Sequence, residues 1–142
     1  MLSIQGFVQL REIYRGEDSV LYRGIRELDQ SPVVLKLLSN QYPSQDEVNR
    51  LLREHETTLA LKSRDGIIQA YALEKVNNAP MLVLEDFQGA SLRSLLDAKR
   101  TFPLDEVLRI GVAVSDALAE IHGAHVIHKD LGIAQINHLC SR

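Results

Sequence analysis

Three polar residues near the C-terminal end of the sequence could do chemistry: His128, Lys129 and Asp130. The apolar pair Val126-Ile127 precedes them, and Leu131 follows. A carboxylate presented on a loop can accept or orient the proton of a hydroxyl group or a water, and a neighbouring His can brace the loop. This spacing therefore predicts a candidate catalytic loop after a long helix.

A second candidate residue is Lys36, in the β-forming run Pro32–Leu38. Because side chains alternate along a strand, Lys36 shares its face with Val34 and Leu38. A cation between two aliphatic neighbours favours a nearby anion. The alternative interpretation is a solvated Lys on an edge strand.

The first 86 residues must position Lys36, and their pattern predicts a largely antiparallel sheet with one inserted helix, an α+β unit. The helix is predicted at 44–61, where Ser44 and Glu47 have the form of a capping box. Glu54 and Glu56 lie near its middle, and either could face the sheet or solvent. An apolar stripe follows the helical period and comprises Val48, Leu51, Leu52, His55 and Leu59. The five strands are expected at 7–13, 20–26, 32–38, 67–74 and 80–86.

The second half turns helical after the short linker 87–91. Helices are predicted at 91–99 and 103–122, and Asp105 and Glu106 in the first turn of the longer one suit the helix dipole. Its expected buried stripe comprises Val107, Gly111, Val114, Leu118 and Ile121. After Leu131 the pattern suggests no clear partner element.

Composition narrows the function classes. The 142 residues carry a net charge of −3, and the 16 Lys and Arg residues are spread along the chain, so we expect neither a nucleic-acid partner nor a membrane surface. No apolar run is long enough to span a bilayer, and the first residues lack the pattern of a secretory signal. The single Cys140 excludes an internal disulfide and favours a cytoplasmic setting.

The order of these motifs resembles a protein kinase domain. Val33-Val34-Leu35-Lys36 is similar to the V-A-I-K strand, and His128-Lys129-Asp130-Leu131 is similar to the H-R-D-L catalytic loop. The resemblance implies that Lys36 contacts the α- and β-phosphates of ATP and that Glu54 pairs with Lys36. It further implies that Asp130 accepts or positions the proton of a substrate hydroxyl group, while His128 braces the loop.

The resemblance also implies an adenine site. Leu84-Glu85-Asp86-Phe87 resembles the hinge, whose backbone groups bind adenine, and the chain would divide into an N-lobe at 1–86, a hinge at 87–91 and a partial C-lobe at 92–142. The sequence of these motifs is most similar to N-terminal kinase domains of large multidomain bacterial sensor proteins. The expected partners are therefore a protein substrate or further domains of such a protein. The residues expected to bind nucleotide are Gly16, Leu21, Lys36, Leu84, Glu85 and Phe87.

The sequence departs from the family pattern at several positions. In the phosphate loop G-x-G-x-x-G-x-V, the matching positions are Tyr14, Gly16, Ser19 and Leu21, so one glycine of three is present. Glu17 and Asp18 add negative charge there, and Gln135 takes the place of the expected Asn. The sequence reaches Arg142 without an Asp-Phe-Gly, which leaves the Mg²⁺ site incomplete. We therefore expect no phosphoryl transfer from residues 1–142.

Two alternatives remain. The first is a truncated pseudokinase that acts as a binding or scaffold module in signalling, because the glycine loop is degraded and the large lobe incomplete. The second is a metal site, since four His residues cluster late in the sequence, although their spacing drifts round a helix and no Cys pair supports them. These residues are His122, His125, His128 and His138.

Overall fold

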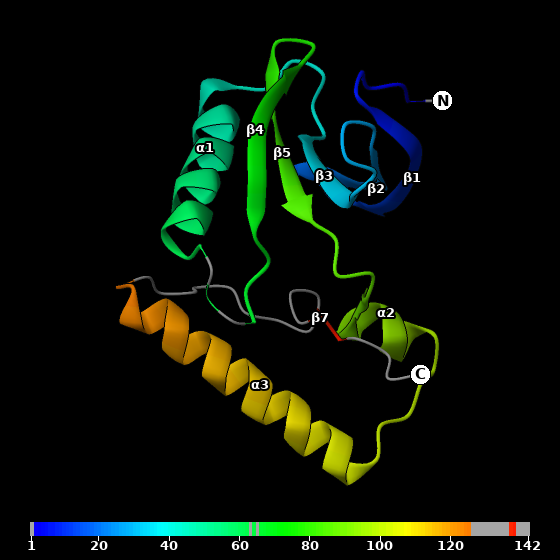
Figure 1. Ribbon diagram of the computed structural model, residues 1–142, viewed down its shortest axis with the longest axis vertical. Coiled ribbons are helices and arrows are strands. Elements are labelled where there is room, and N and C mark those ends of the chain that lie inside the picture. The colour runs from blue at the N-terminus through cyan, green and yellow to red at the C-terminus, as the bar shows by residue number, and fades with distance from the viewer. Residues whose placement is uncertain (1, 63, 65, 126–136, 139–142) are drawn as a thin grey trace. The chain divides into compact units, whose positions relative to one another are not determined.

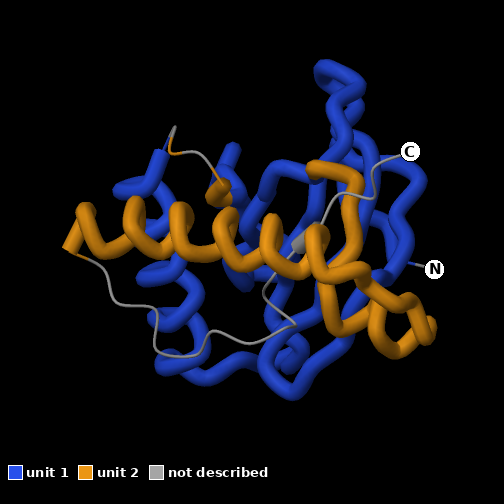
Figure 2. Tube along the Cα trace, turned by 90° about the horizontal axis from the view of Figure 1, so that it is seen from below, with its two compact units in different colours: residues 1–62, 68–86 blue, residues 63–67, 87–142 orange. Residues whose placement is uncertain are grey.

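The computed structural model describes residues 2–62, 64, 66–125 and 137–138. The chain forms two compact units, which Figure 2 shows in different colours. The first unit consists of residues 1–62 and 68–86, and the second of residues 63–67 and 87–142.

The first unit contains a five-stranded sheet with the strand order β1-β2-β3-β5-β4, and every neighbouring pair is antiparallel (Figure 1). The predicted α+β architecture is confirmed. The fourth strand starts at Ala70, three residues later than predicted, and its ladder with β5 shifts register between Ala70 and Ala72. The strands are β1 (Phe7–Arg15), β2 (Ser19–Arg26), β3 (Pro32–Leu38), β4 (Ala70–Val76) and β5 (Ala79–Glu85).

One face of the sheet carries the hydrophobic core. Leu35 lies opposite Val83 in the ladder between β3 and β5, and directly paired residues share a face. Ile4 and Phe7, at the start of the chain, join the same cluster. Met81, Leu82 and Val83 have no exposed surface, so this part of β5 is fully buried.

The opposite face carries the row Leu21, Lys36 and Leu82, which lie side by side on β2, β3 and β5. Helix α1 (Gln45–Ala60) lies beside β4 and β5 (Figure 1). Its capping box is present as predicted: Ser44 accepts a hydrogen bond from the Glu47 amide, and the Glu47 carboxylate accepts one from the Ser44 amide.

The predicted apolar stripe of α1 is wrong at its end. Leu51 is buried, but Leu59 is exposed, and Leu61 is buried instead, one residue beyond the helix. The Leu61 amide donates to the carbonyl of Thr58, so the last turn is tighter than an α-helical turn. Leu61 therefore does not follow the helical period of the residues before it.

The second unit contains two helices, α2 (Leu92–Asp97) and α3 (Leu104–Gly123). A short ladder joins β6 (Ala90–Ser91) to β7 (Asn137–His138), so the late segment has a partner element that the sequence did not suggest. Salt bridges within the unit join Arg64 to Glu120 and Arg100 to Glu106, each at 2.7 Å.

The predicted buried stripe of α3 is wrong, because no residue of this helix is buried and Val107 is exposed. Its apolar residues have the helical period, but the described part of the chain does not supply enough apolar surface to cover them. Among the described residues, no helix is both long and apolar enough to cross a membrane.

Candidate nucleotide site

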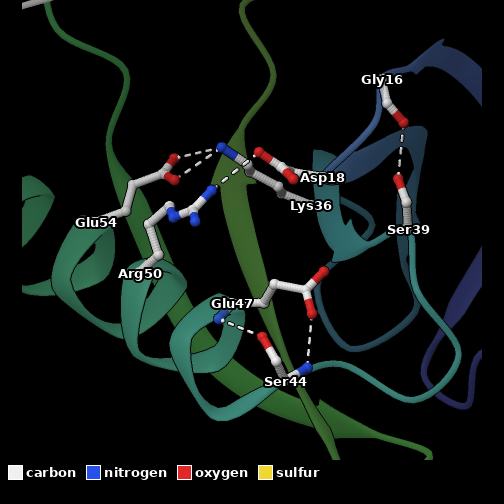
Figure 3. A network of polar contacts seen from close by, with 8 residues as sticks. All are labelled: Gly16, Asp18, Lys36, Ser39, Ser44, Glu47, Arg50 and Glu54. Carbon is white, nitrogen blue, oxygen red and sulfur yellow. Dashed lines mark hydrogen bonds and ion pairs between the residues drawn. The ribbon is translucent and has the colours of Figure 1, made fainter.

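The side chains of Lys36 and Glu54 meet between β3 and α1 (Figure 3). The Lys36 ammonium lies 2.8 Å from each of the two carboxylate oxygens of Glu54. Strand β3 places Lys36 in the middle of the sheet, and the helical turn of α1 directs Glu54 toward it. The sequence left open whether Glu54 or Glu56 faces the sheet. In the structure it is Glu54 that contacts Lys36.

This ion pair stays accessible to solvent. The side chain of Lys36 is 23% exposed and that of Glu54 is 42% exposed. A pair this open contributes little stability, typically about 0–1 kcal/mol, so its main consequence is the orientation of the ammonium. An ammonium has three N–H donors, and an anion that enters from the solvent side can take one that Glu54 does not use.

The turn between β1 and β2 lies at the position expected for the phosphate loop. The Gly16 amide donates to the carbonyl of Ser19 at 2.9 Å, which closes a tight turn. Ser39, at the end of β3, donates its hydroxyl to the carbonyl of Gly16 at 3.0 Å and its amide to the carbonyl of Asp18 at 3.0 Å. The backbone of this turn is therefore fixed by the strand that carries Lys36.

Asp18 is paired with a residue that the sequence reasoning missed. Its carboxylate accepts from the Arg50 guanidinium at 3.0 Å (Figure 3). Arg50 lies one helical turn before Glu54, so α1 contacts both the turn and β3. The four-residue spacing of Arg50 and Glu54 was the available signal, since residues i and i+4 share a helix face. The charge of Asp18 beside the expected phosphate position is thus balanced by a cation.

The predicted hinge begins where β5 ends. Leu84 lies opposite Val34, two residues from Lys36, and so belongs to the face that carries Lys36. The Glu85 amide donates to the carbonyl of Gln69 at 2.8 Å. Phe87 belongs to the second unit.

Asp86, within the predicted hinge, is the one buried charged residue among those described. Its carboxylate contacts Arg23 of β2 at two points, Oδ2 to Nε at 2.7 Å and Oδ1 to Nη2 at 3.0 Å. Sequence reasoning did not single out Arg23. The residues are 63 positions apart, and no local pattern signals their contact.

The predicted catalytic loop lies outside the described residues. His128 and Asp130 belong to the segment 126–136, and so does Gln135. In the ranges that the structure describes, no three His, Cys, Asp or Glu side chains gather as a metal site, so His122 and His125 form none there. We assign no step to Mg²⁺.

Comparison with known proteins agrees with this geometry. The protein kinase domain model matches residues 7–137. The probable serine/threonine-protein kinase pknA2 of Bifidobacterium longum is 29% identical over 125 residues, which are 86% of this chain and 16% of that protein. The serine/threonine-protein kinase PknL of Mycobacterium tuberculosis is 28% identical over 120 residues, which are 84% of this chain and 30% of PknL.

The serine/threonine-protein kinase PknK of Mycobacterium tuberculosis is 30% identical over 129 residues, 89% of this chain and 11% of PknK. The chain thus spans less than a third of the length of these relatives. The family model covers most of the sequence, and the matched region includes the sheet, α1 and the segment 126–136. The chain belongs to the protein kinase domain family.

Proposed function

We propose that this chain carries the ATP-binding part of a serine/threonine protein kinase. Lys36 binds the α- and β-phosphates of ATP, and Glu54 orients the Lys36 ammonium toward them. The observation that carries this proposal is the two-oxygen contact between Glu54 and Lys36 at 2.8 Å on a solvent-accessible face. A fixed cation that water can reach is suited to an anionic ligand.

The remaining nucleotide contacts follow from the face that Lys36 occupies. Leu21 lies opposite Lys36, and Leu84 lies one row away, so both offer apolar contact to an adenine ring. The backbone groups of Glu85 and Phe87 bind its polar edge, and the turn at Gly16 covers the phosphates. These assignments are supported by the register of the sheet and by the family.

The proposed reaction transfers the γ-phosphoryl group of ATP to a Ser or Thr hydroxyl group of a protein. Asp130 accepts or positions the hydroxyl proton, and His128 braces the loop; both roles rest on the resemblance of residues 128–131 to the catalytic loop. Because the 142 residues contain no Asp-Phe-Gly, we propose that they bind nucleotide without transferring phosphoryl groups.

A nucleotide titration tests the proposal. Residues 1–142 should bind ATP with a dissociation constant in the micromolar range, and the titration is run in parallel with and without Mg²⁺. The variant Lys36→Ala should not bind ATP. Lys75→Ala is the matched control, because Lys75 is an exposed lysine on β4 of the same sheet. Equal ATP affinity of the wild type and Lys36→Ala would refute the role of Lys36.

A second candidate, a non-catalytic binding module in signalling, is favoured by one observation. Helix α3 exposes apolar residues in its first half, and such patches favour association. These residues are Leu104, Val107, Leu108 and Val112. Light scattering separates the candidates: concentration-dependent self-association together with no ATP binding supports the module, and a compact monomer counts against it.

A further inference from the structure

We propose that Arg23 is a positioning residue for the hinge: it holds Asp86 and thereby fixes the backbone that presents Glu85 to adenine. The inference rests on the proposed nucleotide site and adds a residue to it. We assign Arg23 no contact with the phosphates or with Lys36, because its guanidinium contacts the carboxylate of Asp86.

The contact between Arg23 and Asp86 has a two-point geometry. Both oxygens of Asp86 are engaged, at 2.7 and 3.0 Å, by two nitrogens of one planar guanidinium. A two-point contact of this kind fixes the orientation of the carboxylate as well as its distance. The Asp86 side chain is only 1% exposed, against 28% for Arg23, so the contact is shielded from water on the Asp86 side.

The contact between Arg23 and Asp86 crosses strand β3. Strand β3 separates β2 from β5, so no backbone ladder joins Arg23 to the chain beyond Glu85. Arg23 lies opposite Val34, and Val34 lies opposite Leu84, so the side chain of Arg23 reaches over β3 toward the end of β5. The ion pair thus ties the chain just after Glu85 to a strand that the backbone of β5 does not reach.

The contact between Arg23 and Asp86 should affect the binding of adenine. Adenine is expected to bind to backbone groups of residues 84–87, and a ligand binds more tightly when the groups it contacts are already held in place. Lys36 is held separately, by Glu54 and by the ladder of β3. Loss of Arg23 should therefore weaken recognition of the base and leave the phosphate contact unchanged.

Two ligands separate these contributions: ATP, which has both parts, and inorganic tripolyphosphate, which has only the phosphates. Arg23→Met should lower the ATP affinity about tenfold, the order expected when one charge-assisted contact is lost, while tripolyphosphate affinity stays unchanged. Arg23→Lys keeps the charge but loses the two-point geometry, so its ATP affinity should lie between those of Arg23→Met and the wild type. Arg26→Met is the matched control, because Arg26 is on the same strand and pairs with Asp29 near the surface.

A merely structural role of Arg23 would lower the affinity for both ligands together, and that result would overturn the proposal. Unchanged ATP affinity in both Arg23 variants would overturn it as well. If Arg23→Met does not fold, the decision rests on Arg23→Lys.

Hydrogen exchange gives a readout that needs no ligand. The Glu85 amide, which bonds to Gln69 at 2.8 Å, and its neighbours within 84–87 should exchange faster in the Arg23 variants, while the amides of β3 and α1 exchange at wild-type rates. If the wild type binds neither ligand, the proposed nucleotide site fails, and exchange alone decides on Arg23. Faster exchange confined to 84–87 supports the positioning role, and unchanged exchange overturns it.

Discussion

The ammonium of Lys36 contacts both carboxylate oxygens of Glu54 at 2.8 Å, although the two residues are 18 positions apart. Lys36 comes from the middle of a five-stranded sheet and Glu54 from helix α1. The contact sets the direction of a solvent-accessible cation, and the proposed nucleotide site is built around it.

Replacing Glu54 with Gln should separate orientation from stability. Because the pair is part-exposed, the free energy of unfolding in urea should fall by no more than about 1 kcal/mol. The ATP affinity should fall several-fold, since Lys36 loses the partner that directs it. Glu56→Gln, on the same helix, is the control and should change neither quantity. An unchanged ATP affinity in Glu54→Gln would contradict the orienting role.

Asp18 and Arg50 should affect ATP binding in opposite directions. Asp18→Asn removes a negative charge near the expected phosphates and leaves Arg50 cationic, so affinity should rise by about twofold to fivefold at low salt. Arg50→Gln leaves Asp18 without this partner and should lower affinity by a similar factor. Both effects should shrink as salt is added, because the pair is exposed. Changes of the same sign would rule out this electrostatic explanation.

The capping box of α1 should make stability depend on pH. The hydrogen bond from the Ser44 amide, followed by that with the Ser44 side chain, holds the pKa of Glu47 below its ordinary value of 4.5. A carboxylate whose pKa is lowered on folding contributes stability above its unfolded pKa, and the contribution is lost as the pH falls through the folded value. The difference in unfolding free energy between wild type and Glu47→Gln should thus be constant near neutral pH and shrink in acid.

The control for this experiment is Ser44→Ala. It should cost about 1 kcal/mol at neutral pH, because the hydroxyl cap of the Glu47 amide is lost. A Glu47→Gln difference that stays constant from neutral pH down to well below 4.5 would show that ionised Glu47 does not stabilise the helix.

The core face of the sheet should be sensitive to cavity formation. Leu35 has no exposed surface, so Leu35→Ala should destabilise the chain by about 2–5 kcal/mol. Leu28 is 91% exposed, and Leu28→Ala should change stability by less than about 0.5 kcal/mol. Chemical denaturation of both variants measures this contrast. Similar losses in the two would mean that the core does not lie on the Leu35 face.

Local sequence patterns were sufficient to predict the helices and the strands of the five-stranded sheet. For the site, the family resemblance predicted the pairing of Lys36 with Glu54. The capping box at Ser44 and the strand around Lys36 each depend on neighbours in sequence, and both are confirmed. Glu54 was predicted as the partner of Lys36 from the family spacing, and the structure brings the two side chains together.

Contacts that depend on the assembled sheet were not predictable in this way. Arg23 meets Asp86 only because β3 brings β2 close to the end of β5, and periodicity within either segment carries no trace of that. Leu59 is exposed although it follows the apolar period of α1, and Leu61, one residue beyond the helix, is buried instead. The helical period of α3 predicted a buried apolar stripe, but periodicity does not say whether a partner surface covers it.

Chemical labelling of Lys36 tests the central claim most directly. A lysine-reactive reagent, followed by mass spectrometry of the labelled peptides, should modify Lys36 more slowly when ATP or tripolyphosphate is present, and adenosine should give no such protection. The exposed residues Lys62 and Lys75 should be labelled equally under all conditions. Equal labelling of Lys36 with and without saturating ATP would contradict the proposal that this lysine binds the phosphates.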